Sequence, residues 1–273
     1  MRGKYFTSFD GAKIYYQTEE RDRHKWLVFL HGFGGDLTAW DSTRAYFTDL
    51  GISTLALDLR GHGFSDRGDN KEFYKFENFA KDLNLLLKQE QIKKPVIVGH
   101  CFGGMVSIYF EAQFPDSSKG LILVDTSYKP PFLGKNRVAK VFFEEFINLL
   151  LKVIPDIKKV GRPDYNKFVG TSDLNLKRIL SDILHTSLKS YLLISKNLAS
   201  LDAKKLLDNI LVPTLVIEGE NDTIFPPEIA RYLSKRIKNS QLELIEGVNH
   251  IIVINDPEDL SKTIHEFLVK INF

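Results

Sequence analysis

Short apolar runs alternate with longer amphipathic segments along most of the chain. The runs are rich in β-branched residues and stand at Trp26–Leu30, Thr54–Asp58, Pro95–Gly99, Leu121–Asp125, Thr214–Glu218 and Leu242–Ile245. Helical spacing of apolar residues marks Leu37–Leu50, Glu72–Gln89, Phe102–Phe114, Pro227–Ile237 and Pro257–Ile271. Buried strands that alternate with helices are typical of a mostly parallel sheet with helices on both faces. The pattern therefore predicts an α/β fold.

Two further strands are predicted at the start of the chain. Lys4–Phe9 and Lys13–Thr18 flank the dipeptide Asp10-Gly11, which favours a tight hairpin turn. With the six buried runs they complete an eight-stranded sheet.

The alternation stops between Thr126 and Leu211. This stretch shows helical periodicity without a strand pattern, and Pro155 and the triplet at 161–163 divide it into short helices. We therefore expect an α/β core formed by residues 1–126 and 211–273, with a helical cap inserted at residues 127–210.

Composition narrows the class of protein. The chain has 273 residues, of which 43% are hydrophobic and 26% charged, as is usual for soluble globular proteins. Its 37 basic and 35 acidic side chains leave a net charge of +2, which gives no reason to expect nucleic acid as a partner. No run approaches the ~18 apolar residues of a membrane span. The one cysteine cannot form an intramolecular disulfide. We expect a cytoplasmic protein, and the oligomeric state stays open.

The only cysteine lies in a distinctive local sequence. The run Val96–Gly104 ends a predicted strand, turns, and begins a predicted helix, with Gly99 two residues before Cys101 and Gly103 two residues after it. A nucleophile on such a sharp turn needs small residues at both positions, because strand and helix come very close there. The helix N-terminus also favours a thiolate. Cys101 is therefore a candidate nucleophile.

A glycine-rich loop supplies a second part of the site. His31-Gly32-Phe33-Gly34-Gly35 directly follows a predicted strand. The backbone N–H groups of Phe33 and Phe102 could together stabilise a developing oxyanion. His31 and His100 are expected to order these loops by hydrogen bonding.

An acid and a histidine follow the last two predicted strands. Asp222 and His250 would lie beside Cys101 at the same edge of the sheet, with His250 as general base and Asp222 orienting it. Asp125, after an earlier strand, is an alternative acid. Along the sequence no cluster of His, Cys and carboxylates has metal-ligand spacing, so neither a metal nor a cofactor is expected.

These residues resemble the α/β-hydrolase superfamily, and the resemblance covers nearly the whole chain. The segment Asp58-Leu59-Arg60-Gly61-His62-Gly63-Phe64-Ser65-Asp66 also looks like a signature of its capped esterase, lactonase and peroxidase-like members. Most such relatives have serine at the position of Cys101, whereas dienelactone hydrolases and polyhydroxyalkanoate synthases use cysteine. The resemblance implies an α/β-hydrolase fold with an inserted helical cap.

Acyl chemistry fits this set of residues best. We predict a hydrolase of carboxylic esters, lactones or thioesters that works through a Cys-His-Asp triad and an acyl-enzyme on a small, largely apolar substrate. An acyltransferase or synthase, a slow-turnover ligand sensor, and a serine esterase with an engineered Ser-to-Cys change remain open. The pocket is expected to include Trp40, Met105, Tyr128, Phe142, Phe143, Phe146 and Phe225.

Overall fold

A computed structural model describes residues 3–130, 137–153, 155–158 and 161–273. Eight strands form one sheet in the order β1-β2-β4-β3-β5-β6-β7-β8. β1 and β2 pair antiparallel, as do β2 and β4, and all other neighbours are parallel. The bounds are β1 Gly3–Thr7, β2 Lys13–Glu19, β3 Trp26–Leu30, β4 Ser53–Leu57, β5 Val96–His100, β6 Gly120–Val124, β7 Thr214–Gly219 and β8 Ser240–Ile245. The predicted sheet is confirmed, with strand ends shifted by at most two residues.

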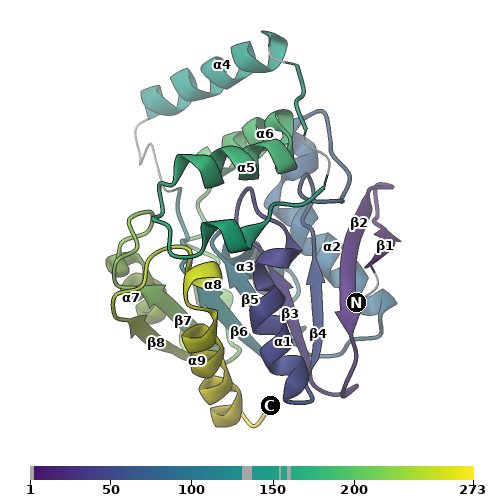
Figure 1. Cartoon of the computed structure of the whole chain (residues 1–273), viewed down its shortest axis with the longest axis vertical. Coiled ribbons are helices and arrows are strands. Elements are labelled where there is room, and N and C mark those ends of the chain that lie inside the picture. The colour runs from purple at the N-terminus through teal and green to yellow at the C-terminus, as the bar shows by residue number, and fades with distance from the viewer. Residues whose placement is uncertain (1–2, 131–136, 154, 159–160) are drawn as a thin grey trace.

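Helices cover both faces of the sheet (Figure 1). Each face has its own apolar layer. One layer lies under α2 (Phe76–Gln89), α3 (Phe102–Gln113) and α7 (Pro227–Arg236). The other lies under α1 (Asp41–Asp49), α8 (Ile252–Asn255) and α9 (Pro257–Lys270). The buried strands have apolar side chains on both faces because both faces are covered.

Three details differ from the predicted elements. The first two predicted helices each begin as a separate 3₁₀ turn, at Leu37–Trp40 and Lys71–Tyr74. The short helix α8 was not predicted, since four residues are too few for a periodic pattern. β8 was predicted as a buried strand but alternates between exposed and half-buried residues, because it is the edge strand and has a neighbour on one side only.

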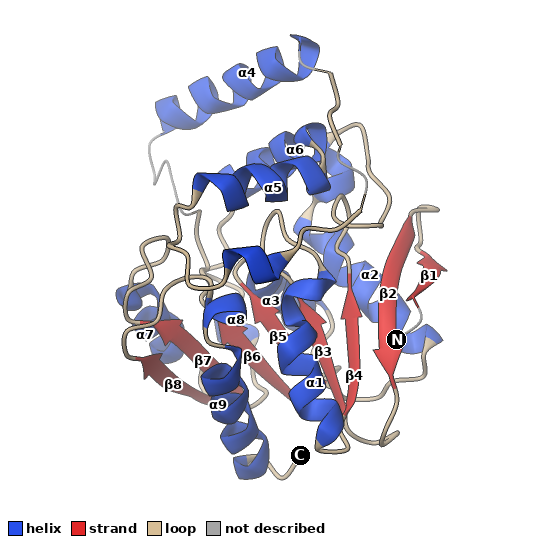
Figure 2. Ribbon diagram, in the orientation of Figure 1, coloured by secondary structure: helices blue, strands red, loops and turns tan. Residues whose placement is uncertain are grey.

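Residues 125–213 are here called the β6–β7 segment, and the described part of this segment lies across the carboxyl ends of the parallel strands (Figure 2). They contain α4 (Arg137–Val153), α5 (Leu176–Thr186) and α6 (Leu188–Ala199), with 3₁₀ turns at Tyr165–Phe168 and Leu207–Asn209. The part of this segment that the structure describes has no strand. None of the described helices combines the length and apolar character needed to span a bilayer.

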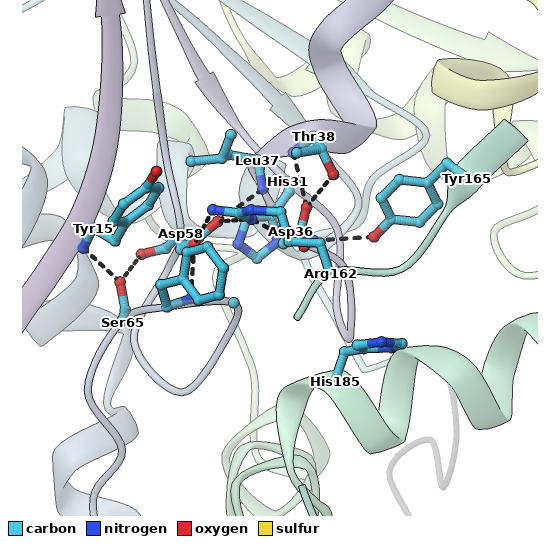
Figure 3. A network of polar contacts seen from close by, with 12 residues as sticks. Tyr15, His31, Asp36, Leu37, Thr38, Asp58, Ser65, Arg162, Tyr165 and His185 are labelled. Carbon is cyan, nitrogen blue, oxygen red and sulfur yellow. Dashed lines mark hydrogen bonds and ion pairs between the residues drawn. The ribbon is translucent and has the colours of Figure 1, made fainter. Parts of the chain in front are cut away.

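Arg162 joins the β6–β7 segment to the sheet (Figure 3). Its guanidinium forms two hydrogen bonds of 3.1 and 2.9 Å with Asp58 and an ion pair of 3.0 Å with Asp36. It lies 5.1 Å from the ring centroid of Tyr15 and 4.3 Å from that of Phe64. Burial and the charge of Asp36 raise the pKa of Asp58 to about 6, against the opposing effect of Arg162. Two buried carboxylates therefore depend on one arginine from the segment.

Candidate active site

Cys101 lies on a strained turn between β5 and α3. Its backbone angles are φ 50° and ψ −111°, which a non-glycine residue adopts only at a cost. A Cβ on Gly99 would lie 2.5 Å from the carbonyl oxygen of Gly103, and a Cβ on Gly103 would lie 2.2 Å from that of Leu30. Both glycines are thus required by close backbone approach. The turn presents Cys101, half-buried, at the N-terminus of α3.

Asp222 and His250 follow β7 and β8 and form a buried pair. Nδ1 of His250 lies 2.6 Å from Oδ2 of Asp222. The other carboxylate oxygen accepts from the amides of Ile224 at 2.6 Å and Phe225 at 2.8 Å. Burial would raise the pKa of Asp222, but the hydrogen bond and charge of His250 outweigh it and lower that pKa. Asp222 therefore stays a carboxylate.

His250 also interacts with Cys101. Burial would lower the pKa of His250, but the negative charge of the Cys101 sulfur and the hydrogen bond with Asp222 raise it well above its usual value. An imidazolium beside the sulfur stabilises a thiolate. His250 is therefore placed to exchange a proton with Cys101.

The loop after β3 lies directly against Cys101. A Cβ on Gly32 would lie 3.4 Å from Cβ of Cys101 and 2.7 Å from Nδ1 of His100, so only glycine fits there. Neither the amide of Phe33 nor that of Phe102 is engaged in a hydrogen bond with the residues that the structure describes. Both N–H groups are available to an oxyanion.

His31 and His100 hydrogen-bond to the loops that they were expected to order. Nδ1–H of His31 donates to the carbonyl of Gly32 at 2.8 Å, and its Nε2 accepts from the amide of Leu59 at 3.0 Å. Nε2–H of His100 donates to the carbonyl of His250 at 2.8 Å. Burial lowers the pKa of both His31 and His100 to about 3, which keeps them neutral.

A cavity of about 610 Å³ opens above Cys101 and His250. Its wall includes Phe33 and Phe102, and three of the predicted pocket residues, Met105, Phe143 and Phe225. Most of the remaining wall is apolar. The wall also contains Arg178 and Asp182 of α5, which form an ion pair of 3.0 Å.

The other four predicted pocket residues lie elsewhere. Trp40 is fully buried in the layer under α1, with its ring 5.1 Å from that of Phe29. The ring of Tyr128 stacks on Tyr232 at 4.6 Å, outside the cavity. Phe142 and Phe146 are 72% and 57% exposed, because they lie on the outer side of α4 while Phe143 faces inward. Sequence spacing alone did not give the direction of these side chains.

Sequence reasoning missed Asp173, which precedes α5 and is 4% exposed. One carboxylate oxygen accepts from the amide of His250 at 2.9 Å. The other accepts from the amide and the hydroxyl of Thr223, at 2.9 and 2.7 Å. Asp173 thus connects the β6–β7 segment to the loops of Asp222 and His250. No motif surrounds it, so no signal in the sequence could have found it.

Asp125, the alternative acid, lies close to the pair but is bonded differently. Its Oδ1 accepts from the amide of Gly219 at 2.9 Å, and its Oδ2 has no hydrogen-bond partner among the described residues. The geometry thus joins His250 to Asp222.

The chain belongs to the family described as alpha/beta hydrolase fold, whose sequence pattern matches residues 25–257. This confirms the predicted fold class and supports a hydrolase enzyme. The chain is 26% identical to epoxide hydrolase 3 of Xenopus tropicalis over 94% of its own length and 75% of that protein. It spans about half the length of several further curated relatives.

Solved structures show the same fold. A thermophilic esterase from Thermogutta terrifontis has a TM-score of 0.78 at 23% identity, covering 100% of both chains. An enol-lactonase from Burkholderia xenovorans LB400 has a TM-score of 0.75 at 24% identity, covering 97% of this chain and 100% of its own.

Proposed function

We propose that this protein hydrolyses carboxylic esters, lactones or thioesters through an acyl-enzyme on Cys101. One observation carries the proposal: the sole cysteine sits on a strained turn at a helix N-terminus, in the wall of a cavity that it shares with a histidine paired to a buried aspartate. A nucleophile, a base and an orienting acid in this arrangement are the parts that acyl transfer requires.

The chemistry follows from the charges of the site. The Cys101 thiolate attacks the carbonyl carbon, and the amides of Phe33 and Phe102 stabilise the oxyanion. The imidazolium of His250 gives its proton to the departing alkoxide or thiolate, which leaves a thioester on the enzyme. His250 then takes a proton from water, whose oxygen attacks the thioester and releases the acid and the thiolate. Asp222 stays ionised and holds Nδ1 of His250 throughout.

Ester chemistry is preferred over epoxide opening because of the nucleophile. Attack on an epoxide by a hydrolase of this fold is expected to use an aspartate on the turn, and this chain has Cys101. An esterase and an enol-lactonase among the structural neighbours agree with the choice. The resemblance to epoxide hydrolase 3 therefore supports a hydrolase of this family and does not decide the reaction.

The cavity favours a substrate of mixed character. Met105, Phe143 and Phe225 suit an apolar acyl or alcohol group, whereas Arg178 and Asp182 suit a hydrogen-bonding group. A lactone or a short ester with one polar substituent matches this wall.

The nucleophile is tested with a thiol-directed alkylator. We expect one equivalent of iodoacetamide to abolish hydrolysis, and substrate to protect against it, with Cys101→Ala as the inactive control. Intact-protein mass spectrometry after mixing with aryl esters, lactones and thioesters should show an acyl adduct that maps to Cys101. Full activity after complete alkylation would refute the assignment.

The same assay separates the remaining functions. An adduct that forms once and persists would indicate a ligand sensor. Faster release with an added alcohol or amine than with water would indicate an acyltransferase.

A further inference from the structure

Three carboxylic side chains lie close together beside His250, although the proposed reaction requires only one. Asp125 follows β6, Glu218 lies in β7, and Asp222 follows β7. A side-chain oxygen of each lies within 4.8 Å of oxygens of the other two. Asp125 and Glu218 have no exposed surface, and Asp222 is 5% exposed. Three negative charges at this distance in a buried site would repel one another strongly.

Hydrogen bonds are shared unequally among the three acids. Asp222 is bonded to His250 and to two backbone amides, and Asp125 accepts from one amide. Neither side-chain oxygen of Glu218 meets a donor among the described residues. A buried carboxylate without donors is costly, whereas a carboxylic acid carries its own donor and needs only an acceptor. The arrangement therefore disfavours an ionised Glu218.

The charged groups around Glu218 lead to the same conclusion. The charges of Asp125, Asp222 and the sulfur of Cys101 all raise the pKa of Glu218. Burial and the charges of Asp222 and Asp173 also raise the pKa of Asp125 well above its usual value, against the opposing charge of His250. His250 is the cation that faces the cluster, and it is paired with Asp222. Burial, followed by the charge of Asp125 and a hydrogen bond to Asp222, raises the pKa of Glu218 to about 12.

We propose that Glu218 is a positioning residue: it is held as a neutral carboxylic acid whose O–H donates to the Asp222 carboxylate and keeps that carboxylate ionised beside His250. The inference rests on the proposed function, because it acts through the acid of that triad. The hydrogen bond from Glu218 lowers the pKa of Asp222, in addition to the larger effect of His250. Glu218 thereby adds one buried donor to the hydrogen-bonded series Cys101–His250–Asp222.

Two replacements separate the neutral acid from a carboxylate. Glu218→Gln keeps the shape, a donor and zero charge, whereas Glu218→Met keeps the volume and removes the donor. Glu243, exposed on the neighbouring strand β8, supplies matched controls as Glu243→Gln and Glu243→Met. The first measurement is the pH profile of kcat/KM on one ester. The second is the infrared spectrum at neutral pH, read for the carbonyl stretch of a protonated carboxylic acid.

We expect the apparent pKa of the acid limb to change by less than about half a pH unit in Glu218→Gln. In Glu218→Met it should rise by about one unit, because Asp222 without the donor is protonated at a higher pH. If the apparent pKa of the acid limb decreases in both variants, Glu218 is ionised. If it is unchanged in both, Glu218 does not act on Asp222. Either result overturns the proposal.

The infrared measurement does not depend on activity. The spectrum of the unsubstituted protein minus that of Glu218→Gln should contain the carboxylic-acid band, and the Glu243 pair should contain none. Absence of the band from the Glu218 difference overturns the neutral acid even if the enzyme is active. A present band in an enzyme that lacks esterase activity would refute the proposed function and leave the protonation state of Glu218 established.

Discussion

The choice between two acids can be tested by changing each to its amide. In Asp222→Asn, the amides of Ile224 and Phe225 require the carboxamide oxygen, so the NH₂ group must face Nδ1 of His250. Nδ1 then accepts, and the ring proton moves to the other nitrogen, which can no longer take a proton from the sulfur. A wrong tautomer of this kind lowers kcat/KM by about 10³-fold or more, which is about 4 kcal/mol of transition-state stabilisation.

Asp125→Asn provides the matched comparison. Its carboxamide oxygen can still accept from Gly219, and its NH₂ replaces an oxygen that has no partner among the described residues. We expect a loss of less than about tenfold. Both variants are assayed by steady-state ester hydrolysis, with thermal unfolding to confirm that each is folded. If Asp125→Asn were the more damaging change, the acid would belong to the end of β6 and the reasoning from hydrogen bonds would fail.

Three further predictions concern the nucleophile, the turn and the cavity. Cys101→Ser should hydrolyse an oxygen ester at least about tenfold faster than Cys101→Ala. A neutral hydroxyl removes the charge that raises the pKa of His250, so the imidazole can act as base. Rates equal to those of the alanine variant would refute this prediction. Gly103→Ala places a Cβ 2.2 Å from the carbonyl oxygen of Leu30 and should cost about 3 kcal/mol in urea unfolding. Burial raises the pKa of Asp182 to about 7, above 3.8 for the free group. Between these two pH values the native state binds more protons than the unfolded state, so its stability decreases as pH rises. The Tm of Asp182→Asn relative to the unsubstituted protein should therefore increase across the same window, and a flat difference would contradict the shift.

The sheet could be predicted from the sequence because its strands are buried on both faces. A run such as Trp26–Leu30 is apolar at every position and fully buried at every position, so composition alone identifies it. β8 was the exception, since an edge strand has alternating exposure that depends on its neighbours. The turn at Cys101 could be predicted equally well, because Gly99 and Gly103 avoid steric clashes with the backbone close to the turn.

Contacts between distant segments could not be predicted in the same way. Asp173 and His250 are 77 positions apart in the sequence, and the residues near them give no indication that they form a hydrogen bond. The grouping of Asp125, Glu218 and Asp222 likewise depends on how adjacent strands end, and the spacing of these residues along the sequence gives no sign of it. Phe142 and Phe143 differ in direction only because α4 has one face toward the cavity. Side-chain direction in the β6–β7 segment needed the fold.

Arg162 and Asp173 limit how the protein can be re-engineered. Each comes from the β6–β7 segment, yet each satisfies groups that belong to the sheet and its loops: Asp36 and Asp58 for Arg162, and the amide of His250 for Asp173. A chimera that received this segment from another hydrolase would keep the carboxylates and the amide but lose their partners. Grafting a foreign segment to change substrate range would therefore require both contacts to be transplanted with it, or the recipient side chains to be replaced in the same step.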